Sequence, residues 1–287
     1  MKRMGLAQRC GACLPAAVLA LLLAVAPLAA QGLGGLADSE EPLEVTAKDG
    51  IEWYREEKLY IARGDARAVS GTTEVFADLL KAHYREGADG GNEIHLIEAI
   101  GAVRIETPNE VVSGDEAQYI LDQEVIVLRG RDLKFASRNG SDTITARDSL
   151  EYWRDREIAV ARGDAQAVHE DKQINADILV AHFEATEGNK QDVNQVDAEG
   201  NVTIRTPTDF VVGNKGIYYV KEELARLQGD VKITRDNNQL NGEYAEVNLA
   251  TGISKLLGSA PGETGSTGRV DALILPKAKP KADSDAD

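Results

Sequence analysis

Apolar and polar residues alternate along most of the chain, as they do in β-strands that turn one face inward. The segments 101–105 (GAVRI), 200–204 (GNVTI) and 229–233 (GDVKI) each place two β-branched residues two positions apart, shortly after a glycine. Such alternation puts the apolar side chains on one face of a strand and the polar side chains on the other. Because no stretch of the body holds a 3.6-residue period with helix caps, the pattern predicts an all-β fold.

A second pattern lies between the glycines and contains one three-residue step. It reads V-x-A-x-x-L-x-A-x-Y in residues 75–84 and returns in related form in 112–119, 174–183, 211–218 and 240–247. The step interrupts the alternation once, and a β-bulge or bend there would return the apolar residues to the inward face. The first of these segments could also be a short helix, but its equivalents carry β-type residues and favour a strand.

The chain contains an internal duplication with an offset of 99 residues. ARGDARAV at 62–69 returns as ARGDAQAV at 161–168, and no gap is needed to align the copies between residues 51 and 229. Glycines 29–37 residues apart mark a smaller repeat, at positions 64, 101, 130, 163, 200, 229 and 258. A unit of this length cannot bury its own apolar face, so we expect one continuous stack of antiparallel strands with open ends.

These patterns divide the chain into a leader, a flexible segment, a β-body and a tail. We expect them at residues 1–30, 31–41, 42–260 and 261–287. Within the body, the two copies span about 51–149 and 150–258. The tail is expected to be mostly disordered, because Gly, Ser, Thr, Lys, Pro and Asp dominate it. The apolar run 270–275 within the tail could add one last strand.

The leader has the layout of a secretory signal peptide. Lys2, Arg3 and Arg9 form a basic head, the apolar run 14–30 follows, and cleavage is expected after Ala30. Cleavage would release an exported protein. A retained membrane anchor is the alternative, because an apolar run of 17 residues lies near the short limit for a spanning helix.

Composition narrows the possible functions. Cys10 and Cys13 both lie in the leader, so the body has no cysteine and can use neither disulfides nor thiolate chemistry. The net charge is −16, and removing the three basic residues of 1–30 makes it about −19. A chain this acidic does not bind nucleic acid non-specifically. Its surface would repel anionic head groups, so a bound amphiphile would be held by its apolar part.

Catalytic and metal-binding patterns are absent from the sequence. The four histidines are not spaced as a zinc motif, and His83 and His182 occupy equivalent positions that we expect to face solvent. Asp78 and Asp177 recur with the repeat, which favours turn or surface roles. We therefore predict no catalytic residue, no metal and no cofactor. Carboxylate pairs could in principle hydrolyse glycans, so a glycan-active enzyme stays an alternative.

Several of these segments resemble the repeats of a known family. Residues 99–105 (AIGAVRI) followed by 112–119 (VSGDEAQY), with 198–204 (AEGNVTI) in the second copy, are similar to the OstA-like, or LptA-like, repeat of lipopolysaccharide-export proteins. The resemblance covers about residues 42–260. It implies a twisted, open β-jellyroll with a hydrophobic groove, in which the acyl chains of lipid A lie inside while the sugars stay in water.

The resemblance also implies partners and a location. Members of this family line up end to end in the periplasm through their edge strands, between an anchored inner-membrane partner and an outer-membrane translocon. By this likeness the chain is a carrier that binds lipopolysaccharide and associates head to tail with itself. A retained leader would instead make it the anchored partner of the same export system. A structural or adhesive β-repeat protein of the cell envelope, without a lipid ligand, is the other alternative.

The candidate groove residues are the inward-facing apolar residues of the repeats. They are Val103, Ile105, Val112, Tyr119, Leu133, Phe135, Val202, Ile204, Val211, Tyr218, Val231 and Ile233. For each residue alone, a place in a dry core is the alternative to lipid contact. If the resemblance holds for function, some members of the set must contact lipid, since burial of each CH₂ group contributes roughly 0.8 kcal/mol.

Overall fold

A computed structural model describes residues 43–87, 90–186, 190–235, 238–248, 250–251, 253–261 and 268–274. Apart from one short 3₁₀ turn at Leu121–Gln123, the secondary structure of these residues is entirely β, which confirms the predicted fold class. The strands are β1 (Glu44–Thr46), β2 (Gly50–Tyr54), β3 (Leu59–Ser70), β4 (Thr73–Glu86), β5 (Asn92–Glu106), β6 (Glu110–Ile120), β7 (Val125–Arg129), β8 (Leu133–Ser137), β9 (Asp142–Ala146), β10 (Ser149–Trp153), β11 (Ile158–His169), β12 (Lys172–Thr186), β13 (Lys190–Arg205), β14 (Asp209–Tyr219), β15 (Leu224–Arg235), β16 (Asn238–Asn248), β17 (Ile253–Leu257) and β18 (Asp271–Leu273).

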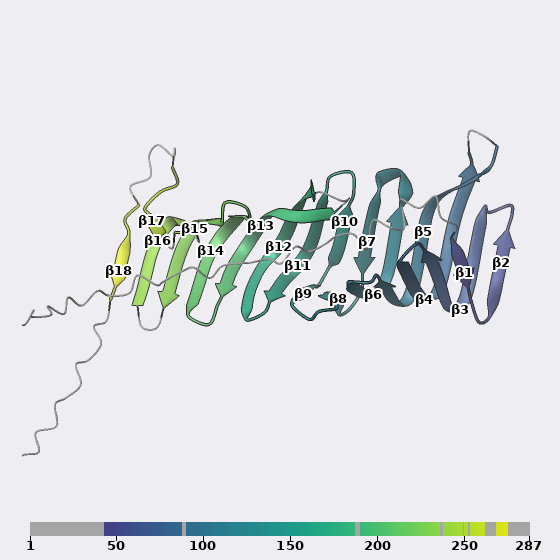
Figure 1. The fold of residues 1–287 in the computed structure, drawn as a ribbon, viewed down its shortest axis with the longest axis horizontal. Helices are drawn as coiled ribbons and strands as arrows, with labels where there is room; N and C mark the ends of the chain where they lie inside the picture. Colours follow the sequence, from purple (N-terminus) through teal and green to yellow (C-terminus); the bar gives the residue numbers. More distant parts are fainter. Residues whose placement is uncertain are drawn as a thin grey trace, which may run out of the picture.

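The strands lie side by side along the long axis of an elongated molecule, from β1 and β2 at one end to β17 and β18 at the other (Figure 1). Every recorded pairing is antiparallel, and the long strands pair with their sequence neighbours from β3 to β6 and from β11 to β16. Between these runs, β7 pairs with β10 and β9 pairs with β11. The two copies of the duplication therefore join in one continuous stack.

Each long strand is bent once and contributes to two faces of the stack. In β3, the part before the bend pairs with β2 and the part after it pairs with β1, with a register shift between Arg63 and Ala66. We call the face that contains β2, β7, β10 and β17 the β10 face, and the face that contains β1, β8, β9 and β18 the β9 face. The bend changes which residues of the strand point inward, so the apolar side chains of both halves face the same interior.

The bends explain the glycines and the three-residue steps seen in the sequence. Gly101 has φ +81°, and a Cβ atom there would collide with the carboxylate of Asp78 on the neighbouring strand. Gly200 has φ +76° and lies against Asp177 in the same way. A residue with a side chain is strained at such φ values, and the close carboxylate excludes it for a second reason. The recurring aspartates thus have a structural place beside the bend.

Most of the core is one cluster of buried side chains that runs from Ala62 in β3 to Val247 in β16, and a second, small cluster contains Tyr152, Phe183 and Val193. Val103, Val202 and Val231 are at most 1% exposed, and they occupy the same place after the bend in three repeats. Small and β-branched residues dominate the larger cluster, as suits closely packed β faces.

Both ends of the stack expose apolar side chains. Ile51 and Trp53 of β2 are 54% and 48% exposed, and Ile253 of β17 and Leu273 of β18 are 65% and 58% exposed. Among the described residues, β1 and β2 each pair only with β3, and β17 and β18 each pair only with β16. Within the described part of the chain, the outer edges of these strands therefore have no partner strand.

Several expectations fall on residues outside the described ranges. They are the leader (1–30), the flexible segment (31–41) and most of the tail. Inside the tail, β18 forms within the apolar run 270–275 and pairs with residues 239–241 of β16. Over the described part of the chain, we find no helix with the length and hydropathy needed to cross a membrane.

Candidate functional site

A central cavity of about 140 Å³ lies between the two faces, where the two copies of the duplication meet. Strands β6 to β13 contribute its walls, and the wall residues are apolar except for two glutamates. The lining residues are Glu110, Val112, Ile126, Leu128, Phe135, Ile144, Leu150, Glu151, Tyr152, Ala159, Val160, Ala161, Ala167, Ile174, Leu179, Ala181, Phe183, Val193 and Val196. An apolar cavity of roughly 150 Å³ stays dry and can bind a molecule the size of benzene.

A second cavity, of about 210 Å³, lies nearer the β2 end of the stack. Its lining comes from β1 to β6 and contains one charged side chain, that of Lys81. The lining residues are Leu43, Val45, Ile51, Tyr60, Ala62, Ala68, Val75, Leu80, Lys81, Ala82, Ile94, Ile97 and Tyr119. Because Leu43 and Ile51 are also exposed, this cavity reaches toward the open end of the stack.

All twelve candidate groove residues face the interior. Eleven are buried and Phe135 is half-buried against the same core. Val112 and Phe135 line the central cavity, and Tyr119 lines the second cavity. The other nine lie in the packed core, outside these two linings. They are Val103, Ile105, Leu133, Val202, Ile204, Val211, Tyr218, Val231 and Ile233. Lipid contact by these residues stays a prediction.

Most walls of the central cavity come from residues that the sequence did not single out as groove residues. Leu150, Val160 and Phe183 are examples, from β10, β11 and β12. Phe183 closes the segment 174–183, which has the same spacing as 75–84. Extending the groove to every copy of that pattern would have found Ile174, Leu179, Ala181 and Phe183 from the sequence alone.

Glu110 is the unusual residue in the wall of the central cavity. It is 4% exposed, and among the described residues its Oε2 atom has no hydrogen-bond partner. Its backbone is held by a turn, because its N–H donates to Thr107 Oγ1 at 3.1 Å and its carbonyl accepts from the Thr107 N–H at 3.0 Å. Burial raises the pKa of Glu110 to about 7. The carboxyl group therefore changes charge near neutral pH.

The other glutamate in the wall, Glu151, is fully partnered. It accepts hydrogen bonds from Ser149 at 2.8 Å, Trp153 at 2.9 Å and Arg162 at 2.9 Å. Burial raises its pKa, but the bonds from Trp153, Ser149 and Arg162 outweigh burial, and the pKa of Glu151 lies below its ordinary value. Glu151 is therefore an ionised part of the wall with its hydrogen-bonding capacity in use.

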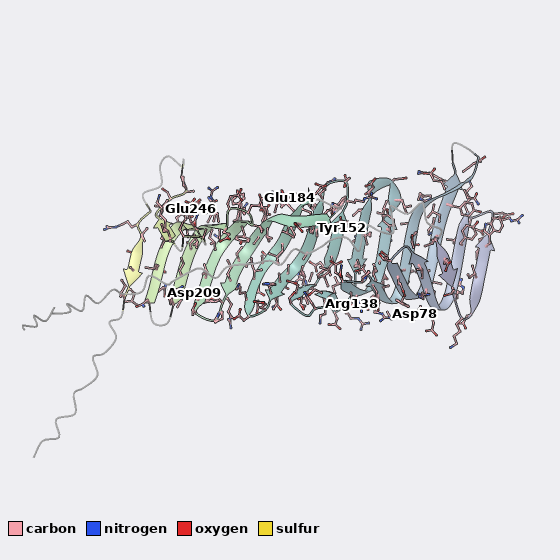
Figure 2. The ribbon with its side chains drawn as sticks, viewed as in Figure 1. Asp78, Arg138, Tyr152, Glu184, Asp209 and Glu246 are labelled. Atoms are coloured by element: carbon pink, nitrogen blue, oxygen red, sulfur yellow. The ribbon has the colours of Figure 1, made fainter. Side chains whose placement is uncertain are left out.

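Acidic side chains recur along the rim of the β9 face, where its strands begin after short turns. Asp142 lies 2.7 Å from Nδ1 of the buried His169, and Asp209 accepts from Nε and Nη2 of Arg235 at 2.6 and 2.7 Å. Asp209 stands 99 residues after Glu110, at the equivalent position in the second copy. Figure 2 shows Asp209 along the lower long edge of the molecule.

The register explains why Glu110 lacks the partner that Asp209 has. Asp209 pairs across the ladder with Arg235, whereas Glu110 pairs with Ser137. The nearby Arg138 is bound elsewhere, since it donates to the carbonyl of Thr107 and to Glu106. The duplication thus keeps an acid at both positions and supplies a matching cation at one of them.

The described residues contain no group of three or more His, Cys, Asp or Glu side chains that could bind a metal ion. His83 lies 2.9 Å from Glu98, and His182 lies 2.9 Å from Asp197. These two rings are about one-third exposed and each is bonded to a carboxylate on the next strand, so that bond holds them at the sheet surface.

The fold and the interior define an elongated β-sheet protein with apolar cavities between its faces, the kind of interior that receives hydrophobic ligands. Residues 143–253 match the family model for "LptA/(LptD N-terminal domain) LPS transport protein". The match supports a relation to the LptA/LptD-like family and to lipopolysaccharide transport, and it does not separate LptA from the LptD N-terminal domain. No curated protein matches the chain.

One solved structure with a detectable likeness is that of LptH from Pseudomonas aeruginosa. Its title describes LptH as the LptA-homologous periplasmic component of a lipopolysaccharide transport device. It shares 12% sequence identity, covers 84% of this chain and 99% of its own chain, and has a TM-score of 0.23. We draw no conclusion from this likeness.

Proposed function

We propose that this protein is a periplasmic carrier that binds lipopolysaccharide and bridges the inner and outer membranes during its export. The acyl chains of lipid A lie between the two faces, and the sugars stay in solvent. The apolar interior that runs along the whole stack carries this proposal, and the family match over residues 143–253 supports it. The body at about 42–260 acts as one binding unit, exported by a leader at residues 1–30.

The sizes of the cavities indicate how much lipid the interior holds without rearrangement. Cavities of about 140 and 210 Å³ each suit a short piece of an acyl chain. A chain of about ten CH₂ groups would gain up to roughly 8 kcal/mol from complete burial. Lipid entry would separate the two faces locally, which breaks side-chain packing between them and leaves the backbone ladders within each face intact.

The two ends of the stack support the bridging part of the proposal. Exposed apolar side chains and unpaired strand edges at both ends suit the addition of further strands from another chain. The partners we propose are a second copy of this chain in head-to-tail contact, an anchored inner-membrane export partner and an outer-membrane translocon.

Photo-crosslinking from adjacent positions of β8 tests the carrier function. Phe135 lines the central cavity, whereas Lys134 is exposed on the outer surface. With a photoreactive residue at Phe135, irradiation in the native host should produce a lipopolysaccharide adduct, and the same residue at Lys134 should produce none. Adducts at Lys134 alone would contradict the proposal. Self-association without any interior adduct would favour a structural β-repeat protein.

A further inference from the structure

Glu110 is a buried carboxyl group that the carrier function does not explain. Its Oε2 atom has no hydrogen-bond partner among the described residues, and the cavity that it faces is otherwise almost entirely apolar. A buried polar group without a partner costs roughly 1–3 kcal/mol. Such groups are rare in folded proteins, and each calls for an explanation.

The neighbouring acids show that this fold can satisfy an acid at the same rim. Asp209, the equivalent of Glu110 in the second copy, is bound at both oxygens by Arg235. Asp142 is paired with His169 at the same rim, and on the β10 face Glu151 is paired with Arg162. Glu110 is set apart from these three acids because it lines the central cavity with an oxygen still free to accept.

We propose that Glu110 is the polar anchor of a binding subsite in the central cavity, and that this subsite takes an aliphatic chain carrying one hydroxyl group. The inference rests on the proposed function, because it assigns a chemistry to part of a ligand held in the same interior. The chain would lie against Val112, Phe135 and Ile144, and its hydroxyl would donate to Oε2 of Glu110.

The donors of the two kinds of group favour a hydroxyl over a cation. A hydroxyl has one proton to donate, and Oε2 of Glu110 is a buried acceptor without a partner among the described residues. An ammonium group has three donors and loses its hydration on entering an apolar cavity, and a single carboxylate does not compensate for that loss. Glu151, the other acid in the wall, already accepts three hydrogen bonds and offers no second site for a cation.

The charged groups near Glu110 are paired with other residues and do not cause the shift of its pKa. Glu106 is paired with Arg104 of its own strand and with Arg138, which follows β8, and Asp142 is paired with His169. The raised pKa of Glu110 is accordingly caused by burial rather than by a neighbouring charge. A hydroxyl donated to the ionised carboxylate makes a charge-assisted hydrogen bond, which is worth about 1.5–3 kcal/mol.

Two probes with the same dodecyl chain and oxygen atom test the subsite, because a methyl group replaces the hydroxyl proton in one of them. 1-Dodecanol and dodecyl methyl ether have the same alkyl chain, and the ether lacks the O–H group. Both can be titrated at pH 8 against the full protein by displacement of the fluorescent apolar dye N-phenyl-1-naphthylamine. We expect the wild-type protein to bind the alcohol about tenfold more tightly than the ether, which corresponds to about 1.4 kcal/mol. In Glu110→Leu the two affinities should become equal, and affinity for the ether should be retained.

Each outcome bears on a separate part of the proposal. Equal binding of both probes to the wild-type protein would overturn the subsite and leave the apolar carrier intact. A preference for the alcohol that survives in Glu110→Leu would also overturn it. Binding of neither probe would overturn the subsite and the proposed function together. Glu110→Gln provides a second variant if Glu110→Leu folds poorly; it keeps an acceptor without the charge, so the preference should shrink and persist in part.

Discussion

Replacing Glu110 by glutamine should stabilise the protein, and more so at higher pH. The change keeps the size and polarity of the side chain and removes its ability to ionise. Burial raises the pKa of Glu110 from 4.5 to about 7, so the folded state disfavours the charged form. Below pH 4.5 the carboxyl is protonated in both folded and unfolded states. Above pH 7 it is ionised in both, and the folded state is then destabilised.

The size of the effect follows from the two pKa values. The free energy of unfolding of the wild-type protein should fall by about 3 kcal/mol relative to Glu110→Gln between pH 4 and pH 8. About 2 kcal/mol of that difference should be present at pH 6. At pH 4 the two proteins should differ only by the neutral acid-to-amide change.

Urea denaturation at pH 4, 6 and 8, followed by circular dichroism, measures this difference. Asp209→Asn is the matched control, because it changes the equivalent residue of the second copy, where the acid is bound by Arg235. At pH 8 the control should lower the free energy of unfolding while Glu110→Gln raises it. A difference between Glu110→Gln and wild type that does not change with pH would refute the account of Glu110 as an unpartnered buried acid.

Three further predictions concern the bend, the rim and the ends of the stack. Gly101→Ala should destabilise the protein more than Gly140→Ala in thermal melts, because both glycines have similar positive φ but only Gly101 has a carboxylate, that of Asp78, against it. The control, Gly140→Ala, should cost about 1 kcal/mol. Equal losses would contradict the contact between Gly101 and Asp78. Asp209→Asn should lower the free energy of unfolding by about 2 kcal/mol at pH 8 in urea melts, because it leaves the half-buried Arg235 without its charged partner; a change near zero would show that the pair contributes little. Ile51→Lys should weaken concentration-dependent self-association in analytical ultracentrifugation without lowering the melting temperature, because a charge on the edge strand β2 opposes its pairing with a strand of another molecule. Unchanged association would place the contact between molecules elsewhere.

Local patterns in the sequence were enough to predict the fold class. A period of two indicates strands, and a single three-residue step that begins at Ala or Gly indicates a bulge or bend, so both could be predicted without knowing any contact. The offset of 99 residues also placed Glu110 and Asp209 at equivalent positions. The inward direction of all twelve candidate groove residues follows from the same period, since a strand cannot turn one of them outward without turning the whole row.

Only the tertiary structure decided where the interior is hollow and which acid is left without a partner. A cavity forms where side chains from strands distant in sequence fail to meet, and its position depends on the volumes on both faces together. The sequence therefore predicted which apolar residues point inward. It did not predict that Val112 and Phe135 border a cavity while Val202 and Val231 lie in tight packing. The difference between Glu110 and Asp209 likewise depends on register, which sets Ser137 across from one and Arg235 across from the other.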